Sequence, residues 1–457
     1  MNLYTKLIAG VVFPAQERLK KHNTVTVRRV LEKTQWWDAG KLRDLQLARL
    51  RNLLQHAAKD VPYYRALFAR LDFLPGEVRE LSDLARLPLL TKEDIRANLT
   101  AMKSRKAHGL TRYNTGGSSG EPLIFFLGKE RISHDVAAKW RATRWWGVDI
   151  GDPEVVVWGS PIELGAQDRL REWRDALMRT ELIPAFEMSE EKLDGFVERI
   201  AERRPKMLFG YPSALAHIAR HAERRGVVLD RLGIRVAFVT SERLYEEQRR
   251  DIERIFGCRV ANGYGGRDAG FIAHECPAGG MHITAEDIIV ETVDESGRPV
   301  DSGTSGEIVV THLATGDFPF IRYRTGDVGV LGDETCPCGR GLPLLKEIQG
   351  RSTDFVVAQD GTVMHGLALI YAVRDIPGVR QFKVIQESLE RTRILLCTDA
   401  AFSESDVETI RKGIADRLGS SVEVCVERVR EVPREASGKY CYVRSHVRAR
   451  SMQNMRR

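Results

Sequence analysis

The chain has 457 residues, of which 43% are hydrophobic and 29% are charged. This composition is typical of a globular protein, and it excludes a disordered, collagen-like or disulfide-stapled chain. Because single hydrophobic cores stop growing well below this length, the chain should form at least two domains.

The formal net charge is +7, from 70 Lys and Arg against 63 Asp and Glu. The segment from Lys439 to Arg457 contains six Lys or Arg and no acidic residue, so the rest of the chain is nearly neutral. A nucleic-acid-binding protein usually spreads its basic residues over the folded surface. This distribution therefore argues against nucleic acid as a partner.

An apolar run extends from Leu7 to Phe13, but Gly10 interrupts it and Pro14 follows it. The run is too short to cross a bilayer and has no convincing cleavage site after it, so we expect neither a transmembrane segment nor a signal peptide. Seven cysteines, an odd number, indicate a reducing compartment. We therefore expect a cytoplasmic protein.

Residues 1 to about 110 are predicted to be helical. Thr91, with Asp94 three residues later, is typical of a capping box that begins a helix. We interpret this region as scaffold. Leucines recur at helical spacing among charged residues at Leu42, Leu45, Leu50, Leu53 and Leu54.

The pattern changes between about Tyr113 and Gly332, where short apolar runs alternate with turn residues and amphipathic helices. Repeated strand, loop and helix predict an α/β sheet whose functional residues lie in the loops that follow the strands. The predicted strands are 154–158, 207–209 and 236–239, and the helices after the last two end near Gly226 and Gly257.

A domain boundary is predicted near Gly350, Arg351 and Ser352. Beyond it the chain restarts as a small α+β unit. Its predicted strands are 381–385, 393–397 and 422–426, and its predicted helix is 404–418.

The most informative segment is a loop with three glycines and three hydroxyl residues in six positions. Such a loop lets backbone N–H groups approach phosphate oxygens, and the hydroxyls add neutral donors. No Gly-Lys-Ser/Thr closes it, so it is not a Walker loop. The six residues are Thr115, Gly116, Gly117, Ser118, Ser119 and Gly120.

Three further motifs supply the other groups that a nucleotide needs. Asp327, in the motif 323–327, offers a carboxylate for a ribose diol. In the motif 262–268, Tyr264 offers an aromatic face for a base and Asp268 a carboxylate for a metal–phosphate group. Lys439 lies in a glycine-containing loop near the C-terminus and offers a cation.

In this order the motifs resemble those of the adenylate-forming (acyl-CoA synthetase) superfamily. More narrowly, the chain resembles the phenylacetate-CoA ligase branch and its capsular-polysaccharide-associated relatives. The match covers nearly the whole chain, including the segments 61–64 and 87–92. The resemblance implies an α/β fold with a large AMP-binding domain at 1–350, its β-sheets flanked by helices, and a small mobile α+β lid at 351–457.

The resemblance also implies the activity, in which a carboxylic acid reacts with ATP and Mg²⁺ to give an acyl-AMP and pyrophosphate. The acyl group then passes to a thiol or an amine. Lys439 and Asp268 would be the catalytic residues, and Asp268 would also be a magnesium ligand. A metal ion and a Lys would neutralise the negative charges of the acid and of the ATP phosphates that it attacks. The ATP-binding residues would be Thr115 to Gly120 for the phosphates, Ser241, Glu242, Asn262, Gly263, Tyr264 and Gly265 for the adenine, and Asp327 and Arg351 for the ribose.

Two positions depart from the usual superfamily pattern. Glu121 stands where many members carry Lys, which removes a cation from beside the pyrophosphate. Asp268 stands where the family usually has Glu, and it is one methylene shorter. Asp still binds hard cations, so the assignment of a magnesium ligand is kept.

Two half-reactions need two arrangements of one site, so the lid is expected to rotate about residues 351–354, with Thr353 and Asp354 as candidate hinges. The acid pocket is predicted to include Trp158, Tyr211 and Pro212. Its aromatic side chains favour an aryl or arylacetic acid.

A second cluster combines Cys276 and His282 with Cys336 and Cys338. Three thiolates and one imidazole complete a closed tetrahedral zinc site, which would hold geometry without doing chemistry. His274 is the competing nitrogen ligand, and ordinary reduced cysteines are the alternative. Similar cysteine-containing segments in the resembling branch favour a structural Zn²⁺ that clamps the loops around Tyr264 and Tyr323.

Three functions follow from these features. The first is an acid–thiol ligase that uses CoA as the acceptor. The second transfers the acyl-adenylate to an amine, as an amide ligase in polysaccharide or secondary metabolism. The third is a catalytically silent nucleotide-binding scaffold, which the retained Lys439, Asp327 and Asp268 argue against. A homodimer is left open as the assembly.

Overall fold

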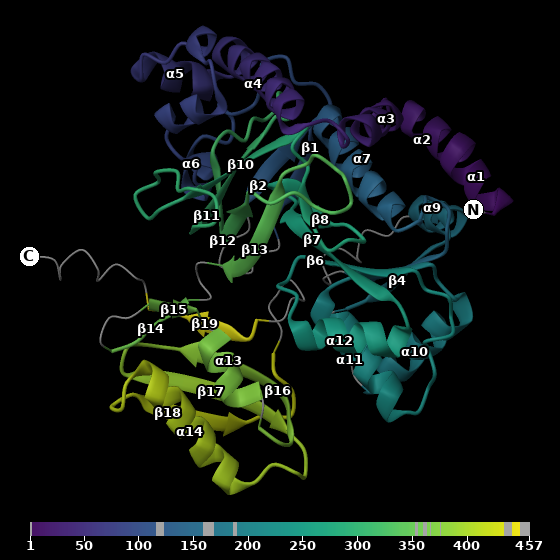
Figure 1. Ribbon diagram of the computed structural model, residues 1–457, viewed down its shortest axis with the longest axis vertical. Coiled ribbons are helices and arrows are strands. Elements are labelled where there is room, and N and C mark those ends of the chain that lie inside the picture. Colours follow the sequence, from purple (N-terminus) through teal and green to yellow (C-terminus); the bar gives the residue numbers. More distant parts are fainter. Residues whose placement is uncertain are drawn as a thin grey trace, which may run out of the picture. The chain divides into compact units, whose positions relative to one another are not determined.

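The computed structural model divides the chain into two compact units, Met1–Ile348 and Gln349–Arg457 (Figure 1). No helix within the described ranges has the length and apolar character needed to cross a membrane. The structure describes residues 2–115, 123–158, 169–185, 190–351, 355–359, 363–365, 367–374, 376–433 and 441–447.

The first unit begins with helices, as the leucine spacing predicted. In the long helix α4, Leu42, Leu50, Leu53 and Leu54 are buried. Thr91 caps α6, and Thr91 Oγ1 accepts a hydrogen bond from Asp94 N at 3.1 Å, which confirms the predicted capping box. The elements are α1 (Leu3–Leu7), a π-helical turn (Ile8–Val12), α2 (Phe13–Leu19), α3 (Thr24–Thr34), α4 (Ala39–Asp60), α5 (Pro62–Arg70), 3₁₀ turns at Pro75–Glu77 and Leu81–Arg86, and α6 (Lys92–Ala97).

An 11-stranded sheet forms the centre of the first unit, with the strand order β10-β11-β12-β13-β9-β8-β7-β6-β5-β3-β4. One half of the sheet is parallel, and the predicted strands 154–158, 207–209 and 236–239 all lie in it. Parallel strands are buried on both faces, which explains their continuous apolar runs. Its strands are β3 (Glu154–Trp158), β4 (Thr180–Pro184), β5 (Met207–Gly210), β6 (Val236–Thr240) and β7 (Arg259–Gly266).

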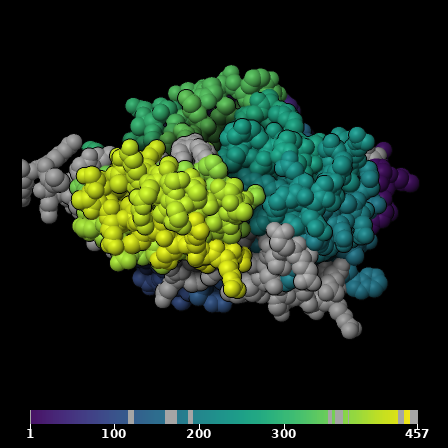
Figure 2. All heavy atoms as spheres, turned by 90° about the horizontal axis from the view of Figure 1, so that it is seen from below, coloured from purple at the N-terminus to yellow at the C-terminus, as the bar shows by residue number. Residues whose placement is uncertain are grey.

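Helices cover both faces of the parallel half. α10 (Glu190–Arg203), α11 (Pro212–Arg224) and α12 (Glu246–Phe256) pack on one face, and their side chains form much of the teal surface in Figure 2. α7 (Lys129–Trp145) packs on the other face through Ala142, against Phe209 and Phe238. α9 (Arg169–Met178) precedes β4. This layering leaves the loops after the parallel strands at one edge.

The other half of the sheet is antiparallel. Leu90 forms a bridge beside Tyr323, with hydrogen bonds from Leu90 N to Arg322 O at 2.8 Å and from Arg324 N to Leu90 O at 3.0 Å. The segment 87–92 therefore supports the start of β12. The strands are β8 (Gly270–Glu275), β9 (Met281–Ile283), β10 (Ile288–Val293), β11 (Ser305–His312), β12 (Tyr323–Gly332) and β13 (Leu344–Arg351), and a separate hairpin pairs β1 (Thr111–Asn114) with β2 (Ile124–Leu127).

The second unit is the expected α+β fold. Its sheet has the order β18-β17-β16-β19. The predicted helix 404–418 matches α14 (Glu404–Leu418), and the three predicted strands fall on β16 (Val379–Gln386), β17 (Arg391–Thr398) and β18 (Glu423–Arg428). The remaining elements are β14 (Phe355–Val357), β15 (Val363–His365), α13 (Leu367–Arg374) and β19 (Val443–Ser445).

Candidate active site

Four groups of predicted site residues lie at the ends of β3, β5, β6 and β7 or directly after them. Because these strands are parallel neighbours, Trp158, Tyr211, Ser241 and Tyr264 come to the same edge of the sheet. Ser241 has a φ of 71°, an uncommon conformation for a residue with a side chain. Backbone strain of this kind clusters at functional sites.

Glu242, beside Ser241, faces the start of a helix. Its Oε2 accepts a hydrogen bond from the backbone N of Ser213 at 3.2 Å, in the first turn of α11. Pro212 is the first residue of that helix, where its fixed φ is favourable. The carboxylate of Glu242 therefore satisfies a helix-terminal donor.

An aromatic wall stands beside these loops. Trp158 stacks on Tyr211 with ring centroids 4.4 Å apart and an interplanar angle of 27°, and it lies 5.8 Å from Phe209. Tyr211 is buried, while Trp158 is partly exposed. The exposed part of Trp158 offers a flat apolar surface at the end of β3.

Tyr264 and Asp327, which are 63 residues apart in the sequence, are hydrogen-bonded. Tyr264 Oη donates to Asp327 Oδ2 at 2.9 Å. Burial, and then the charge of Asp327, raise the pKa of Tyr264 well above its usual value, so the phenol remains a donor. Gly326 has a φ of 77°, which favours glycine in the turn that presents Asp327.

Asp268 is held by a second tyrosine. Tyr323 Oη donates to Asp268 Oδ2 at 2.6 Å, and the backbone N of Ala269 donates to Asp268 Oδ1 at 3.1 Å. Behind the loop, Arg131 Nη2 donates to the carbonyl of Asp268 at 3.3 Å. A side chain at Gly266 would clash, since its Cβ would lie 2.7 Å from Asp268 Oδ1. The carboxylate is therefore fixed in direction and partly exposed.

Thr115 lies at the base of the glycine-rich loop. Its backbone N donates to Leu123 O at 3.0 Å, and its Oγ1 accepts from Leu123 N at 2.9 Å, so it extends the β1–β2 hairpin. The rest of the loop, Gly116, Gly117, Ser118, Ser119 and Gly120, lies outside the described residues, as do Glu121, Thr353, Asp354 and Lys439. Arg351 ends β13, and only its backbone is described.

Asn262, Gly263 and Gly265 lie within β7, beside β8. The backbone N of Asn262 donates to Glu275 Oε2 at 2.8 Å, which fixes the strand. Cβ atoms would lie 2.7 Å from the ring of Phe238 at Gly263 and 2.2 Å from the carbonyl of Gly270 at Gly265. The glycines are therefore required by close packing as well as by any contact with a nucleotide.

The predicted zinc ligands form one cluster. The ligand atoms of Cys276, His282, Cys336 and Cys338 all lie within 4.8 Å of one another. His282 Nδ1 lies 3.2 Å from the carbonyl of Leu342, which leaves Nε2 facing Cys338 Sγ at 3.2 Å. Burial lowers the pKa of His282 to about 4, so the ring is neutral. A neutral imidazole with its second nitrogen bonded to a carbonyl is the usual form of a metal-binding histidine.

His274 is not part of this cluster. The centroid of its ring lies 5.5 Å from that of Phe271 and 5.8 Å from that of Phe238, and neither ring nitrogen has a hydrogen-bond partner among the described residues. The expected location of the clamp was wrong. Cys276 follows the end of β8 and Cys336 follows the end of β12, whereas Tyr323 begins β12. The cluster ties the opposite ends of these strands, because an extended strand separates its two ends by several residues' length.

Sequence reasoning missed two residues that hold Asp268, one through its carboxylate and the other through its backbone carbonyl. Tyr323 was recognised only as part of a motif and received no role of its own. Arg131, which is almost fully buried behind Asp268, received none. No local pattern could reveal these contacts, since they join residues 55 and 137 positions apart.

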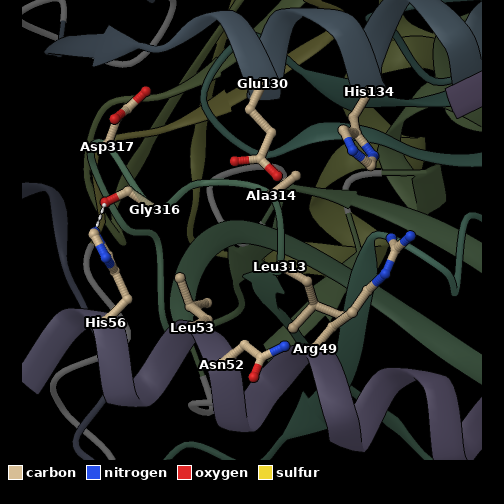
Figure 3. Close-up of a pocket in the computed structure, with 10 residues that line it drawn as sticks. All are labelled: Arg49, Asn52, Leu53, His56, Glu130, His134, Leu313, Ala314, Gly316 and Asp317. Carbon is tan, nitrogen blue, oxygen red and sulfur yellow. Dashed lines mark hydrogen bonds between the residues drawn. The ribbon is translucent and has the colours of Figure 1, made fainter. Parts of the chain in front are cut away.

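A separate cavity of about 320 Å³ lies between α4, α7 and the loop after β11 (Figure 3). None of the predicted site residues that the structure describes lines it. His56 reaches Gly316 O across its edge at 3.0 Å. The lining residues are Arg49, Asn52, Leu53, His56, Glu130, His134, Leu313, Ala314, Gly316 and Asp317.

The fold matches the crystal structure of 2-hydroxyisobutyryl-CoA ligase in complex with an acyl-AMP, with a TM-score of 0.72 and 20% identity over 90% of both chains. Protein CapK of Staphylococcus aureus is 24% identical over 96% of both chains. Phenylacetate-coenzyme A ligase of Thermus thermophilus is 26% identical over 86% of this chain and 84% of its own.

The fold is that of the adenylate-forming CoA ligases. The family model of the CapK C-terminal domain matches residues 356–446. The chain is a homologue of CapK and of the phenylacetate-CoA ligases, as the motif resemblance implied.

Proposed function

We propose that the protein activates a carboxylic acid with ATP to form an acyl-adenylate and then transfers the acyl group to CoA. The observation that carries this proposal is the pair of crossed hydrogen bonds by which Tyr264 holds Asp327 and Tyr323 holds Asp268, at the end of the parallel half of the sheet. The homology with phenylacetate-CoA ligases over most of the chain supports it.

In the first half-reaction an oxygen of the acid attacks the α-phosphorus of ATP, and pyrophosphate leaves. Asp327 would accept hydrogen bonds from the ribose hydroxyls, and Tyr264 would present its ring to the adenine. Lys439 would bring a positive charge to the carboxylate and the α-phosphate oxygens. In the second half-reaction the thiol of CoA attacks the acyl carbon, and AMP leaves.

Asp268 fits a magnesium ligand. Each carboxylate oxygen accepts one hydrogen bond and keeps a lone pair, and the group is partly exposed. Mg²⁺ is usually held by one or two carboxylates together with substrate phosphates. When bound, the ion would neutralise charge that develops on the pyrophosphate.

The aromatic wall supports an aryl or arylacetic acid as the substrate. Trp158 and Tyr211 are stacked, and Phe209 extends the wall beneath them. A planar apolar acid would add a further layer to this stack. Because ATP and CoA are cytoplasmic metabolites, we place the reaction in the cytoplasm.

We further propose that Cys276, His282, Cys336 and Cys338 bind a structural Zn²⁺. The compact arrangement of their ligand atoms and the carbonyl partner of His282 support this assignment. Four protein ligands leave no open position, so the ion would hold the loops after β8 and β12 together.

The test of the proposed function is acid-dependent release of pyrophosphate from ATP and Mg²⁺, measured over a panel of aryl, alkyl and amino acids with and without CoA. Release that yields a thioester supports the proposal and names the acid. Release that consumes an amine instead of CoA would identify an amide ligase, and silence over the panel would contradict adenylation.

A Lys439→Ala variant separates the two half-reactions. We expect it to lose acyl-adenylate formation and to retain most of the transfer from preformed acyl-adenylate to CoA. Unchanged pyrophosphate release would contradict the role assigned to Lys439.

A further inference from the structure

Two tyrosine–carboxylate pairs cross between the nucleotide motifs. Tyr264 of β7 donates to Asp327 of β12, while Tyr323 of β12 donates to Asp268, which follows β7. Each motif therefore supplies one carboxylate and the hydroxyl that holds the carboxylate of the other motif.

The hydroxyl of Tyr323 is fixed without any help from Asp268. Tyr323 is fully buried, and its ring packs edge-on against Phe320 with centroids 5.1 Å apart. The bridge to Leu90 holds the backbone on both sides of Tyr323. The position of the donor is therefore set by the sheet and its packing.

Asp268, in contrast, lies in a short loop between β7 and β8 and is partly exposed. With only the hydrogen bond from Ala269 N, the carboxylate could rotate about its side-chain bonds. The 2.6 Å bond from Tyr323 Oη removes this freedom and occupies one lone pair of Oδ2. The remaining lone pairs then have a fixed direction.

We propose that Tyr323 is a positioning residue that fixes the Asp268 carboxylate for Mg²⁺·ATP. This inference rests on the proposed function for the identity of the ligand. The inference goes beyond the proposed function because it makes the affinity for the metal depend on the buried hydroxyl of Tyr323, which would itself contact neither the metal nor the nucleotide. Preorganising a short Asp in this way compensates for the reach that a Glu would have at this position.

The crossed arrangement also has a consequence for the two carboxylates together. Asp327 lies four residues after Tyr323 on the same strand, and Asp268 lies four residues after Tyr264. A shift of β12 against β7 would therefore disturb both hydrogen bonds at once. The ribose contact and the metal contact are held in one geometry.

The test compares Tyr323→Phe with the wild-type protein. Phenylalanine keeps the ring contact with Phe320 and removes only the hydroxyl. The first readout is binding of Mn²⁺ to the protein–ATP complex, followed by the electron paramagnetic resonance signal of free Mn²⁺. We expect the dissociation constant of Mn²⁺ to rise about 10-fold, the effect of losing one hydrogen bond to a charged group.

The matched control is Tyr64→Phe. Tyr64 is also buried, its Oη donates to Pro319 O at 3.2 Å, and it does not contact either carboxylate. We expect this variant to bind Mn²⁺ as the wild type does. Equal weakening in both variants would overturn the proposal, because it would show a general effect of losing a buried hydroxyl near β12.

A double-mutant cycle with Asp268→Asn tests whether Tyr323 acts through Asp268. In the Asp268→Asn background, Tyr323→Phe should cause no further weakening of Mn²⁺ binding. A full additional 10-fold loss would overturn the proposal, as would wild-type-like binding in Tyr323→Phe itself.

The second readout is the Mg²⁺ concentration that gives half-maximal acid-dependent pyrophosphate exchange. It should rise by the same factor, with little change in the KM for the acid. If the wild type binds Mn²⁺·ATP but exchanges no pyrophosphate with any acid, the proposed function fails, while the Mn²⁺ titration still decides the role of Tyr323.

Discussion

β8 and β12 carry polar clusters of opposite character at their two ends. At one end Tyr323 holds the partly exposed carboxylate of Asp268, whose remaining lone pairs are available to a ligand. At the other end Cys276 and Cys336 are buried, and their sulfur atoms lie 3.6 Å apart and face each other. We call the end with Tyr323 and Asp268 the open end, and the end with Cys276 and Cys336 the closed end.

The two ends differ in the way that a metal–nucleotide site and a structural zinc site, as proposed above, would differ. At the open end, hydrogen bonds fix the direction of a carboxylate and leave part of its coordination free. At the closed end, four potential zinc ligands converge, and the Zn²⁺ that we propose there would leave no coordination position for a substrate. Four substitutions should distinguish the two ends, and their expected effects decrease in the order given.

Cys336→Ser should break the closed end. Losing a metal that is present at about 1,000 times its dissociation constant removes about 4 kcal/mol from the free energy of unfolding. Zinc content by mass spectrometry and thermal unfolding would measure the effect. Cys258→Ser is the control, since Cys258 is buried but outside the cluster. Equal zinc content in both variants would contradict the assignment.

Asp268→Asn should break the open end without changing its shape. The amide retains the size of the carboxylate but loses the charge that faces the metal. We expect acid-dependent pyrophosphate exchange to fall about 100-fold, or about 3 kcal/mol, with little change in thermal stability. Asp301→Asn, in an exposed turn, should exchange normally. A metal role for Asp268 is refuted if the two variants have similar rates.

His312→Asn should make the free energy of unfolding less sensitive to acid. Burial, and then Arg131, lower the pKa of His312 to about 4 from 6.5, although the carboxylate of Asp135 opposes this. The unfolded chain therefore binds a proton that the folded protein excludes, and the stability present above pH 6.5 is lost as the pH falls toward 4.

At pH 5 this loss is about 2 kcal/mol relative to pH 7. Urea unfolding at both pH values would measure it, and the loss should be smaller by about that amount in His312→Asn. His108→Asn, an exposed histidine, should keep the wild-type difference. The same pH difference in His312→Asn and wild type would contradict the prediction.

Tyr264→Phe should give the smallest effect. The ring remains available to the adenine, but Asp327 loses the hydroxyl that donates to Oδ2. We expect the KM for ATP to rise about 10-fold, or about 1.4 kcal/mol, with the Mg²⁺ requirement changed less than in Tyr323→Phe. Steady-state kinetics at varied ATP would decide, and an unchanged KM would show that Tyr264 does not position Asp327.

The sequence by itself determined the local structure and the order of the motifs. The apolar runs of β3, β5 and β6 predicted buried strands because a parallel sheet is covered on both faces. The helix α14 and the capping box at Thr91 followed from periodicity and from residues three positions apart. The motifs also predicted the candidate carboxylates Asp268 and Asp327, because these lie inside short recognisable segments.

Only the tertiary structure decided which residues hold these carboxylates and where the cysteine cluster lies. Tyr323 reaches Asp268 across 55 residues, and Cys336 reaches Cys276 across 60, between segments whose strands are not neighbours in the sheet. His282 joins the cysteines and His274 does not, although both histidines face each other on adjacent strands. Sequence spacing cannot make this choice, because it depends on which histidine lies against Cys338, and that contact joins residues 56 positions apart.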